Sequence, residues 1–366
     1  MSEMVYLEDV CEILDNRRIP VTAKDRKLGK YPYYGANGIQ DYVDSYIFDD
    51  ELVLLAEDGG NFGSKDRPIA YRVSGKCWVN NHAHVLKAKP MIDVDYLCYS
   101  IMFYDVSSIV NGATRQKLNQ ADMRKMKIPL PSLGKQKYVV AVLNRITDFI
   151  AKSKRLLELL DELVQARFVE MFGDKNNYTS STLNDVCSII TDGTHQPPTF
   201  TTSGIPFIFV ANITKNEITY NTDKYISEET YNQLLKRTPI EIGDVLLSTV
   251  GSYGHPAMVK SNTKFLFQRH IAYLKPNHNI VESIYLYGFF LSPLGQKQIE
   301  ERVKGIAQKT LNLTEIKKIQ LAIPPLKLQQ QFGTFFEQID KSKSQIAKSL
   351  EQLETLKKAL MRKYFG

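Results

Sequence analysis

The sequence predicts a mixed α/β (α+β) protein with two globular domains, two long helices and an internal repeat. One observation is that residues 112–131 return in altered form as residues 305–324, with Gly, Leu, Asn, one Lys and the last Pro identical in place. Another is that each half of the chain ends in a long segment of helical periodicity. Since 366 residues are too many for one ordinary core, both observations favour a duplicated architecture.

The repeat extends over the whole chain. The sequence LEDVC at Leu7 returns as LNDVC at Leu183, and HAHVLK at His82 returns as HIAYLK at His270. The offset is 176 residues in the first case, 188 in the second and 193 from Gly112 onward, so the second copy carries its insertions early. Matches that keep their order along the chain indicate duplication rather than chance.

The globular part of each half is predicted to mix strands with helices. Residues 51–56, 245–249 and 265–274 are β-type runs bounded by Gly, Pro and Asn. Residues 94–104 and 284–305 have helical patterns. This mixture predicts an α+β domain in each half.

The second part of each half is predicted to be one long helix. Residues 135–171 contain no Pro or Gly, residues 328–364 contain only Gly333, and prolines stand just before both segments. At about 1.5 Å per residue, each helix would be roughly 55 Å long. The expected organisation is a globular domain at 1–131, a long helix at 132–173, a globular domain at 174–325 and a long helix at 326–366.

Apolar residues at spacings of three and four form a narrow stripe along both helices. We expect the helices to pair with each other antiparallel as a coiled coil, which gives the chain an approximate two-fold axis. The alternative is that each helix packs on its own globular domain. The predicted pairing residues are Ile146, Ile150, Leu157, Leu160, Val164, Ile339, Ile346, Leu350, Leu353 and Leu360.

Composition places few limits on function. The chain is 43% hydrophobic and 24% charged, and its net charge of +7 is compatible with binding a polyanion. No segment approaches about eighteen uninterrupted apolar residues, and the N-terminus lacks a secretory pattern. The four cysteines show no metal-ligand spacing. We expect a cytoplasmic protein with reduced thiols, no metal site and no contact with a membrane.

The chain resembles the specificity (S) subunit of type I restriction–modification systems. The resemblance covers its whole length. It rests on YPYYGANGIQDYV at residues 31–43, on the repeated G-x-x-[RQ]-x-x-L-N at Gly112 and Gly305, and on the long helix after each copy. It implies that each globular domain is a target-recognition domain that reads one half of an asymmetric bipartite site in double-stranded DNA. The long helices then set the spacing and dock two methyltransferase (M) subunits, to which two restriction (R) subunits add.

The same resemblance implies a non-catalytic subunit. Adenine-N6 methylation would use S-adenosylmethionine held by the M subunits, and cleavage would use ATP and magnesium held by the R subunits. No cofactor is expected in this chain. The residues agree, because the nearest match to the amino-methyltransferase loop [DNS]-P-P-[FYW] is QPPT at Gln196, which fails at both ends, and no Walker loop is found.

Candidate DNA contacts are polar, basic and aromatic side chains on predicted loops. Asn pairs with adenine through both groups of its amide, and Arg or Lys binds phosphate and guanine. The candidates are Lys30, Tyr34, Asn37, Lys65, Asn81, Arg115, Gln116, Lys117, Thr194, His195, Gln196, Tyr253, His255, Arg269, Gln308 and Lys309.

Each candidate has a structural alternative. Tyr34 would also pack under a hairpin that turns at Asn37-Gly38, and His82 and His270 would also suit buried, hydrogen-bonded positions. Asn119 and Asn312 are expected to be helix N-caps.

Three other functions remain open at this point. The first is a catalyst in its own right, a single-chain nuclease or methylase, against which the missing motifs count. The second is the recognition subunit of a type IIB-like bipartite-cutting system. The third is a coiled-coil adaptor whose globular domains bind protein or sugar.

Overall fold

The computed structural model describes residues 3–64, 66–112, 116–173, 178–305 and 309–366. It divides into two compact units, Met1–Ser153 with Ser349–Gly366, and Lys154–Lys348. Each long helix therefore contributes one segment to each unit. We keep the names first domain and second domain for the globular residues 1–131 and 174–325.

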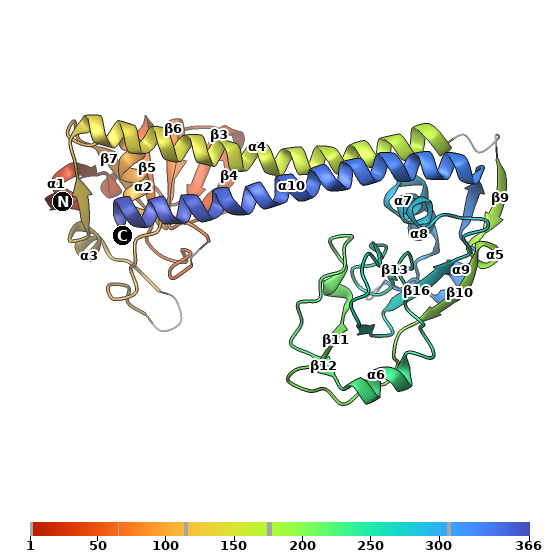
Figure 1. The fold of residues 1–366 in the computed structure, drawn as a ribbon. Helices are drawn as coiled ribbons and strands as arrows, with labels where there is room; N and C mark the ends of the chain where they lie inside the picture. Colours follow the sequence, from red (N-terminus) through yellow and green to blue (C-terminus); the bar gives the residue numbers. More distant parts are fainter. Residues whose placement is uncertain (1–2, 65, 113–115, 174–177, 306–308) are drawn as a thin grey trace. The chain divides into compact units, whose positions relative to one another are not determined.

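The first domain is built on a six-stranded sheet with strand order β2-β7-β5-β6-β3-β4 (Figure 1). All neighbours are antiparallel except β3 and β6. A separate antiparallel pair joins β1 to β8. The strands are β1 (Glu3–Tyr6), β2 (Cys11–Ile13), β3 (Leu28–Gly35), β4 (Gly38–Val43), β5 (Phe48–Ala56), β6 (Ala70–Val79), β7 (Ala83–Ala88) and β8 (Lys127–Leu130). The helices are α1 (Leu7–Val10), η1 (Asp15–Arg17), α2 (Val94–Ile101) and α3 (Gln120–Arg124).

Alternation along β5 divides the core of the first domain between the two faces of this sheet. Val53 and Leu55 join the cluster that contains α2 and the first turns of the long helix, while Leu52 and Leu54 join a cluster on the other face. Successive side chains of a strand point to opposite faces, so a fully apolar run is buried on both. The predicted strand at residues 51–56 and the hairpin at Asn37-Gly38 are confirmed.

The second domain carries two sheets and a two-stranded pair. The four-stranded sheet has the order β10-β16-β13-β14, the three-stranded sheet has the order β12-β11-β15, and β17 pairs with β9. The strands are β9 (Thr179–Thr182), β10 (Cys187–Asp192), β11 (Ile205–Ile208), β12 (Tyr225–Ile226), β13 (Val245–Ser248), β14 (Pro256–Met258), β15 (Leu266–Phe267), β16 (Ile271–Pro276) and β17 (Gln320–Ile323). The helices are α5 (Leu183–Val186), η3 (Val210–Asn212), α6 (Glu228–Leu234), α7 (Ser283–Leu291), α8 (Pro293–Arg302) and α9 (Leu313–Lys317).

Two predicted elements of the second domain are wrong in detail. The single run at 265–274 is two strands, because Gln268 and its neighbours leave the ladder to bond with Ile208 and Thr194. The helix expected over 284–305 is two helices, because Ser292 ends α7 and caps α8, with Pro293 at the first helical position.

The internal repeat is confirmed at the level of single hydrogen bonds. Gln136 is buried, accepts from the Asp93 N–H (2.7 Å) and donates to the Pro131 carbonyl (2.8 Å). Its counterpart Gln329 is equally buried, accepts from the Glu282 N–H (2.8 Å) and donates to the equivalent proline carbonyl (2.8 Å). Because both copies place the same amide on the same main-chain groups, the duplication extends to the hydrogen bonds between the long helix and the main chain of its globular domain.

The two long helices are α4 (Leu133–Phe172) and α10 (Leu326–Phe365), within a few residues of the prediction. In the first unit the ammonium of Lys135, near the start of α4, lies 5.7 Å from the Tyr364 ring, near the end of α10. In the second unit Phe168, near the end of α4, lies 5.3 Å from the Phe332 ring, near the start of α10. The antiparallel arrangement is therefore confirmed within each unit.

The predicted stripe is buried or half-buried at every pairing position. The alternative is realised as well, because both helices also pack on the globular domains. In the second unit the rings of Phe168 and Phe172 lie 5.2 and 4.8 Å from that of Tyr285 on α7. Pairing and domain packing thus share the same helices, and the stripe is wider than a narrow coiled-coil seam.

Among the helices in the described part of the chain, none combines the length and the apolar character that a membrane span requires. The four cysteines, Cys11, Cys77, Cys98 and Cys187, are buried free thiols. Burial raises the pKa of each to about 12.

Candidate nucleic-acid interface

In the first domain the hairpin turn meets the loop that follows β5. The Asn37 amide donates a hydrogen bond to the Gly59 carbonyl (2.9 Å), and the Tyr34 ring lies 5.9 Å from that of Tyr71. Lys30 is exposed, with its ammonium 5.4 Å from the Tyr31 ring. The candidates Lys30 and Asn37 therefore lie at the surface, whereas Tyr34 is half-buried in packing.

The segment that follows Gly112 is attached to the end of β5 through main-chain bonds. Lys117 and Asn111 exchange two hydrogen bonds (2.7 and 2.9 Å), and the Leu118 N–H donates to the Glu57 carbonyl (2.8 Å). Gln116 and Lys117 are exposed, as is Asn81 on the loop between β6 and β7. The candidates Lys65, Arg115 and Gln308 lie outside the described residues.

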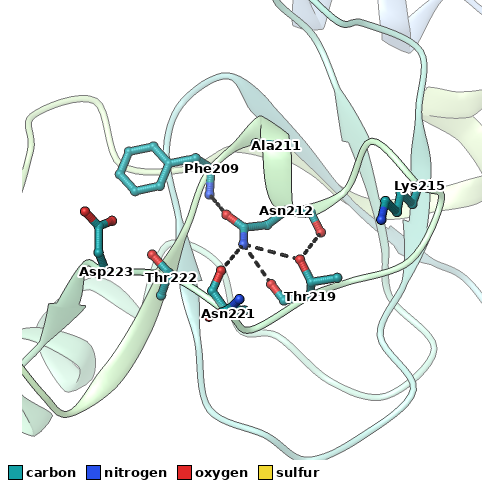
Figure 2. Close-up of a pocket in the computed structure, with 8 residues that line it drawn as sticks. All are labelled: Phe209, Ala211, Asn212, Lys215, Thr219, Asn221, Thr222 and Asp223. Atoms are coloured by element: carbon teal, nitrogen blue, oxygen red, sulfur yellow. Dashed lines mark hydrogen bonds between the residues drawn. The ribbon is translucent and has the colours of Figure 1, made fainter. Parts of the chain in front are cut away.

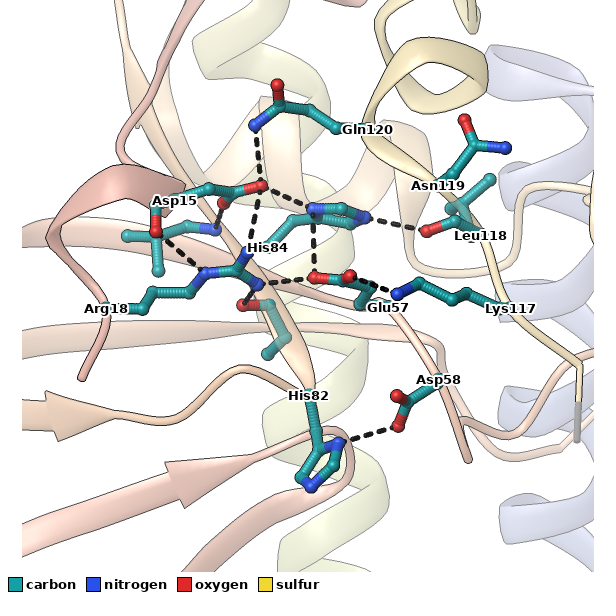
Figure 3. Close-up of polar contacts among 12 residues, drawn as sticks. Asp15, Arg18, Glu57, Asp58, His82, His84, Lys117, Leu118, Asn119 and Gln120 are labelled. Carbon is teal, nitrogen blue, oxygen red and sulfur yellow. Dashed lines mark hydrogen bonds and ion pairs between the residues drawn. The ribbon is translucent and has the colours of Figure 1, made fainter. Parts of the chain in front are cut away.

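Beneath this segment lies what we call the buried ionic cluster, in which the buried Asp15 and His84 join the partly buried Arg18 and Glu57 and the exposed Lys117 (Figure 3). Arg18 contacts the Glu57 carboxylate (2.5 Å), and Lys117 contacts the same carboxylate (3.0 Å). His84 Nδ1 lies 2.6 Å from Asp15 Oδ2. The cluster therefore connects η1, β5 and β7 to the segment that carries the exposed candidates.

His84 is buried, and both of its ring nitrogens have partners. Its Nδ1 faces the Asp15 carboxylate, and its Nε2 lies 2.9 Å from the Leu118 carbonyl. Both ring nitrogens of His84 are therefore engaged by oxygen atoms of the cluster and of the neighbouring main chain. The burial of Asp15 would raise its pKa, but hydrogen bonds from His84, Val85 and Gln120 outweigh burial and lower it.

Asp15, Glu57 and His84 also have the geometry of a possible metal site, because one ligand atom from each lies within 4.8 Å of the others. Burial would raise the pKa of Glu57, but hydrogen bonds from Arg18 and Lys117 lower it below its ordinary value. These two carboxylates are thus already engaged by Arg18, Lys117 and His84. The cluster fits an ion-pair network better than a metal centre.

Sequence reasoning missed this cluster. The motif HAHVLK directed attention to His82, which is half-exposed and pairs with Asp58 (2.7 Å) at the end of the strand. His84 stands two residues further on, so it points to the same face but lies inside the domain. A histidine in the middle of a buried strand was the available signal, since an ionisable group there needs partners.

In the second domain three candidates come together. The Thr194 N–H donates to the Phe267 carbonyl (2.9 Å), and the Thr194 carbonyl accepts from the Arg269 N–H (3.1 Å). His195 Nε2 lies 2.8 Å from Asp192, which also pairs with Arg237. His195, Gln196 and Arg269 are exposed. Strand pairing between distant segments therefore places Thr194, His195 and Arg269 on one surface.

Tyr253 and Lys309 come together on a neighbouring loop. The Lys309 ammonium lies 5.9 Å from the Tyr253 ring, and the Lys309 carbonyl accepts from the Gly251 N–H (3.2 Å). His255 is placed differently, with Nδ1 3.3 Å from Asn216, whose carbonyl accepts from Tyr287 on α7 (2.7 Å). Burial lowers the pKa of His255, so it is neutral at pH 7. DNA contact by these residues stays a prediction.

The two predicted N-caps behave differently. Asn119 accepts from the Asp122 N–H (2.9 Å), so its capping role is confirmed. Asn312 stands at the N-cap position of α9 but its side chain makes no capping bond, so the prediction is wrong for that side chain. Glu315, the counterpart of Asp122, is longer and pairs instead with Lys318 (3.2 Å).

An open pocket of about 620 Å³ lies in the second domain, lined by residues between β11 and β12 (Figure 2). Asn212 holds it together by accepting from the Phe209 N–H (3.0 Å) and donating to the carbonyls of Thr219 (3.0 Å) and Asn221 (2.9 Å). Lys215, also on its lining, is exposed. The residues that line it are not among the predicted DNA contacts.

Comparison with known proteins gives a consistent result. A family model described as the type I restriction modification DNA specificity domain matches residues 2–162 and again residues 175–355. A putative type I restriction enzyme specificity subunit of Haemophilus influenzae is 28% identical, over 94% of this chain and 89% of that protein. The EcoBI specificity subunit of Escherichia coli is 22% identical, over 71% of this chain and 62% of that protein.

Solved structures show the same fold. The crystal structure of a type I restriction–modification S subunit from M. genitalium matches with a TM-score of 0.64 at 16% identity, covering 100% of this chain and 96% of that chain. A chain from a structure of type I restriction–modification complex assembly and conformational transition matches with a TM-score of 0.55 at 18% identity, covering 99% and 97%.

Proposed function

Since the chain belongs to the family of type I restriction–modification DNA specificity domains and is a DNA-recognition subunit, we propose that each of its domains reads a different half of an asymmetric bipartite site. The observation that carries this proposal is one hydrogen-bonded frame that occurs twice with different side chains. Where the first domain has Glu57 and Lys117, the second has Thr249 and Thr310. A shared frame with unlike polar groups supports two unlike half-sites.

The long helices would determine the distance between the half-sites and dock the methyltransferase subunits. Their stripe is buried, yet Leu156, Leu159 and Leu163 on α4 remain 43 to 45% exposed. Spacings of three and four place these leucines on one helix face. An exposed apolar row of this kind supports a protein partner at that face.

In this proposal two M subunits and two R subunits supply the chemistry. S-adenosylmethionine would be held by the M subunits, and ATP and magnesium by the R subunits. The chain itself would bind and orient DNA. The ion-paired state of the buried ionic cluster supports that division, since its carboxylates are engaged with Arg18, His84 and Lys117.

Methylome sequencing of cells that express this chain with its M partner tests the proposal. We expect N6-methyladenine at one bipartite motif, with two specified words separated by a fixed gap. Exchanging residues 174–325 for those of a relative should change one word and keep the other and the gap. Methylation without a motif, or in one continuous word, would contradict the proposal. Cleavage on both sides of the site would indicate a type IIB-like system instead.

A further inference from the structure

The second domain has a pocket of about 320 Å³ that sequence reasoning did not identify. It lies where β10 and β13 end, beside the turn before β16 and the segment that leads into α9. We call it the Arg269 pocket. Its polar lining consists of Asp192, Thr249, Arg269, His270, Thr310 and Asn312.

Two side chains of the Arg269 pocket have unused hydrogen-bonding groups. Thr249 is only 5% exposed, yet among the described residues its hydroxyl has no hydrogen-bond partner. The Thr249 hydroxyl lines the pocket and can donate a hydrogen bond to a group that enters it. The Asn312 amide lines the same pocket and is exposed, and it does not cap its helix.

Arg269 gives the pocket its positive charge. Its Nε donates to His270 Nε2 (3.3 Å), which leaves the His270 proton on Nδ1. Burial, and then the charge of Arg269, lower the pKa of His270, so that ring is a neutral donor at pH 7. In the part of the chain that the structure describes, no carboxylate pairs with the Arg269 guanidinium, whose remaining N–H groups are available to a ligand.

The one carboxylate of the lining is already compensated. Asp192 pairs with Arg237, and its other oxygen lies 2.8 Å from His195 Nε2. An anion in the pocket would therefore meet a donor-rich lining without an uncompensated negative charge.

In the described part of the first domain, the buried ionic cluster occupies the equivalent place. Glu57 and Thr249 are structural counterparts: their N–H groups donate to the carbonyls of His82 (2.9 Å) and His270 (3.0 Å). Their own carbonyls both accept from the leucine that follows the repeated loop, at 2.8 Å in each case. A carboxylate in one domain thus occupies the position of a hydroxyl in the other.

We propose that the Arg269 pocket binds one backbone phosphodiester of the DNA half-site that the second domain reads. The proposal rests on the proposed function and adds a defined ligand group to it. The guanidinium offers charge-assisted bonds to phosphate oxygens, and the hydroxyl and amide groups add neutral donors. Because Glu57 and its ion-pair partners occupy the equivalent position in the first domain, the proposed contact belongs to the second domain.

The test uses the full chain in complex with its M subunits and a duplex that carries the cognate site. Affinity is measured over a range of salt concentrations for the wild type and for Arg269→Ala. One lost phosphate contact should reduce the slope of log K against log salt by about 0.9. Thr249→Val and Asn312→Ala should each weaken binding without changing the slope, since they remove neutral donors.

Lys264→Ala is the matched control. It removes a cation of the same domain that pairs with Glu228 on α6, outside the pocket. Its slope should equal that of the wild type. An unchanged slope for Arg269→Ala, with site-specific binding intact, overturns the pocket and leaves the proposed function standing. If the wild-type complex shows no sequence-specific binding to DNA, the proposed function itself is contradicted.

Single methylphosphonates, placed in turn along the duplex, identify the phosphate. We expect one position in the second half-site at which removing the charge weakens the wild type but not Arg269→Ala. The proposal is overturned if Arg269→Ala is insensitive to a methylphosphonate in the first half-site instead, or if no such position is found. The proposal is also overturned if inorganic phosphate stabilises the complex through Arg269 while no methylphosphonate substitution changes the affinity for DNA.

Discussion

The first and second domains share a main-chain frame but differ in what lies between their central sheet and the repeated loop. In the first domain charged side chains fill that place, with His84 at the centre. In the second domain Ala272 takes the position that matches His84 in the repeat, and a pocket remains. The difference shows that the frame of hydrogen bonds can be kept while the polar groups on it change, which is what two unlike DNA half-sites require.

The largest expected effect is that of His84→Leu, which leaves the buried Asp15 carboxylate without its partner at 2.6 Å. Losing one partner of a buried ion pair costs about 3–5 kcal/mol. Trp78, the single tryptophan, lies on β6, so urea unfolding followed by its fluorescence reports on the first domain. His82→Leu is the control and should cost less than about 1 kcal/mol. If His84→Leu and His82→Leu lower the free energy of unfolding equally, the buried ionic cluster does not contribute the expected extra stability.

The shared frame predicts equal effects in the two domains. Gln136→Leu and Gln329→Leu should each destabilise their own domain by about 2–3 kcal/mol, because each leaves a buried N–H and buried carbonyls without partners. Hydrogen–deuterium exchange localises the loss, to β1 and β8 for Gln136→Leu and to β9 and β17 for Gln329→Leu. A loss in one domain and none in the other would break the equivalence of the two frames.

Acidification should separate the domains. The pKa values of Asp15 and Glu57 in the folded state lie below the ordinary 3.8 and 4.5. The stability that their ionised forms contribute is therefore complete above the ordinary pKa values, and it is lost as the pH falls through the lowered folded-state values. Burial instead raises the pKa of Asp244 in the second domain, so its contribution is present below pH 3.8 and is lost as the pH rises. As the pH is lowered, hydrogen exchange should increase in β5 and β7 of the first domain before it increases in β13 and β16 of the second domain. Earlier exchange in β13 and β16 would contradict this.

The smallest expected difference concerns the helix caps. Asn119→Ala removes a capping hydrogen bond and should cost about 1 kcal/mol, whereas Asn312→Ala removes none and should leave stability unchanged. Thermal unfolding of the two variants measures both. A similar cost at Asn312 would mean that its amide supports the helix and is not available to a ligand.

The sequence predicted the parts of the fold that depend on local patterns. Helical periodicity and flanking prolines defined α4 and α10 to within a few residues, and Asn37-Gly38 identified the hairpin. The buried ionic cluster could not be predicted in the same way, because η1, β5 and β7 supply its members from far apart in the sequence. Only the pairing of those strands shows that Asp15, Glu57 and His84 meet.

The candidate site was predicted in part. Loop position identified Thr194 and Arg269, which the structure brings together through β15 and β16. It did not identify Thr249, since a threonine at the end of an apolar strand is common. The role of Thr249 emerges only from the structure, which places it on the lining of the Arg269 pocket.

The burial of all four native thiols has a practical consequence for labelling. A thiol with a pKa of about 12 has almost no thiolate at neutral pH and is shielded from reagents. A single cysteine introduced on the surface, for example at Lys30 or Lys264, would therefore react alone with a maleimide dye. Pairs of dyes placed this way could report the distance between the domains with and without DNA, without first removing any native cysteine.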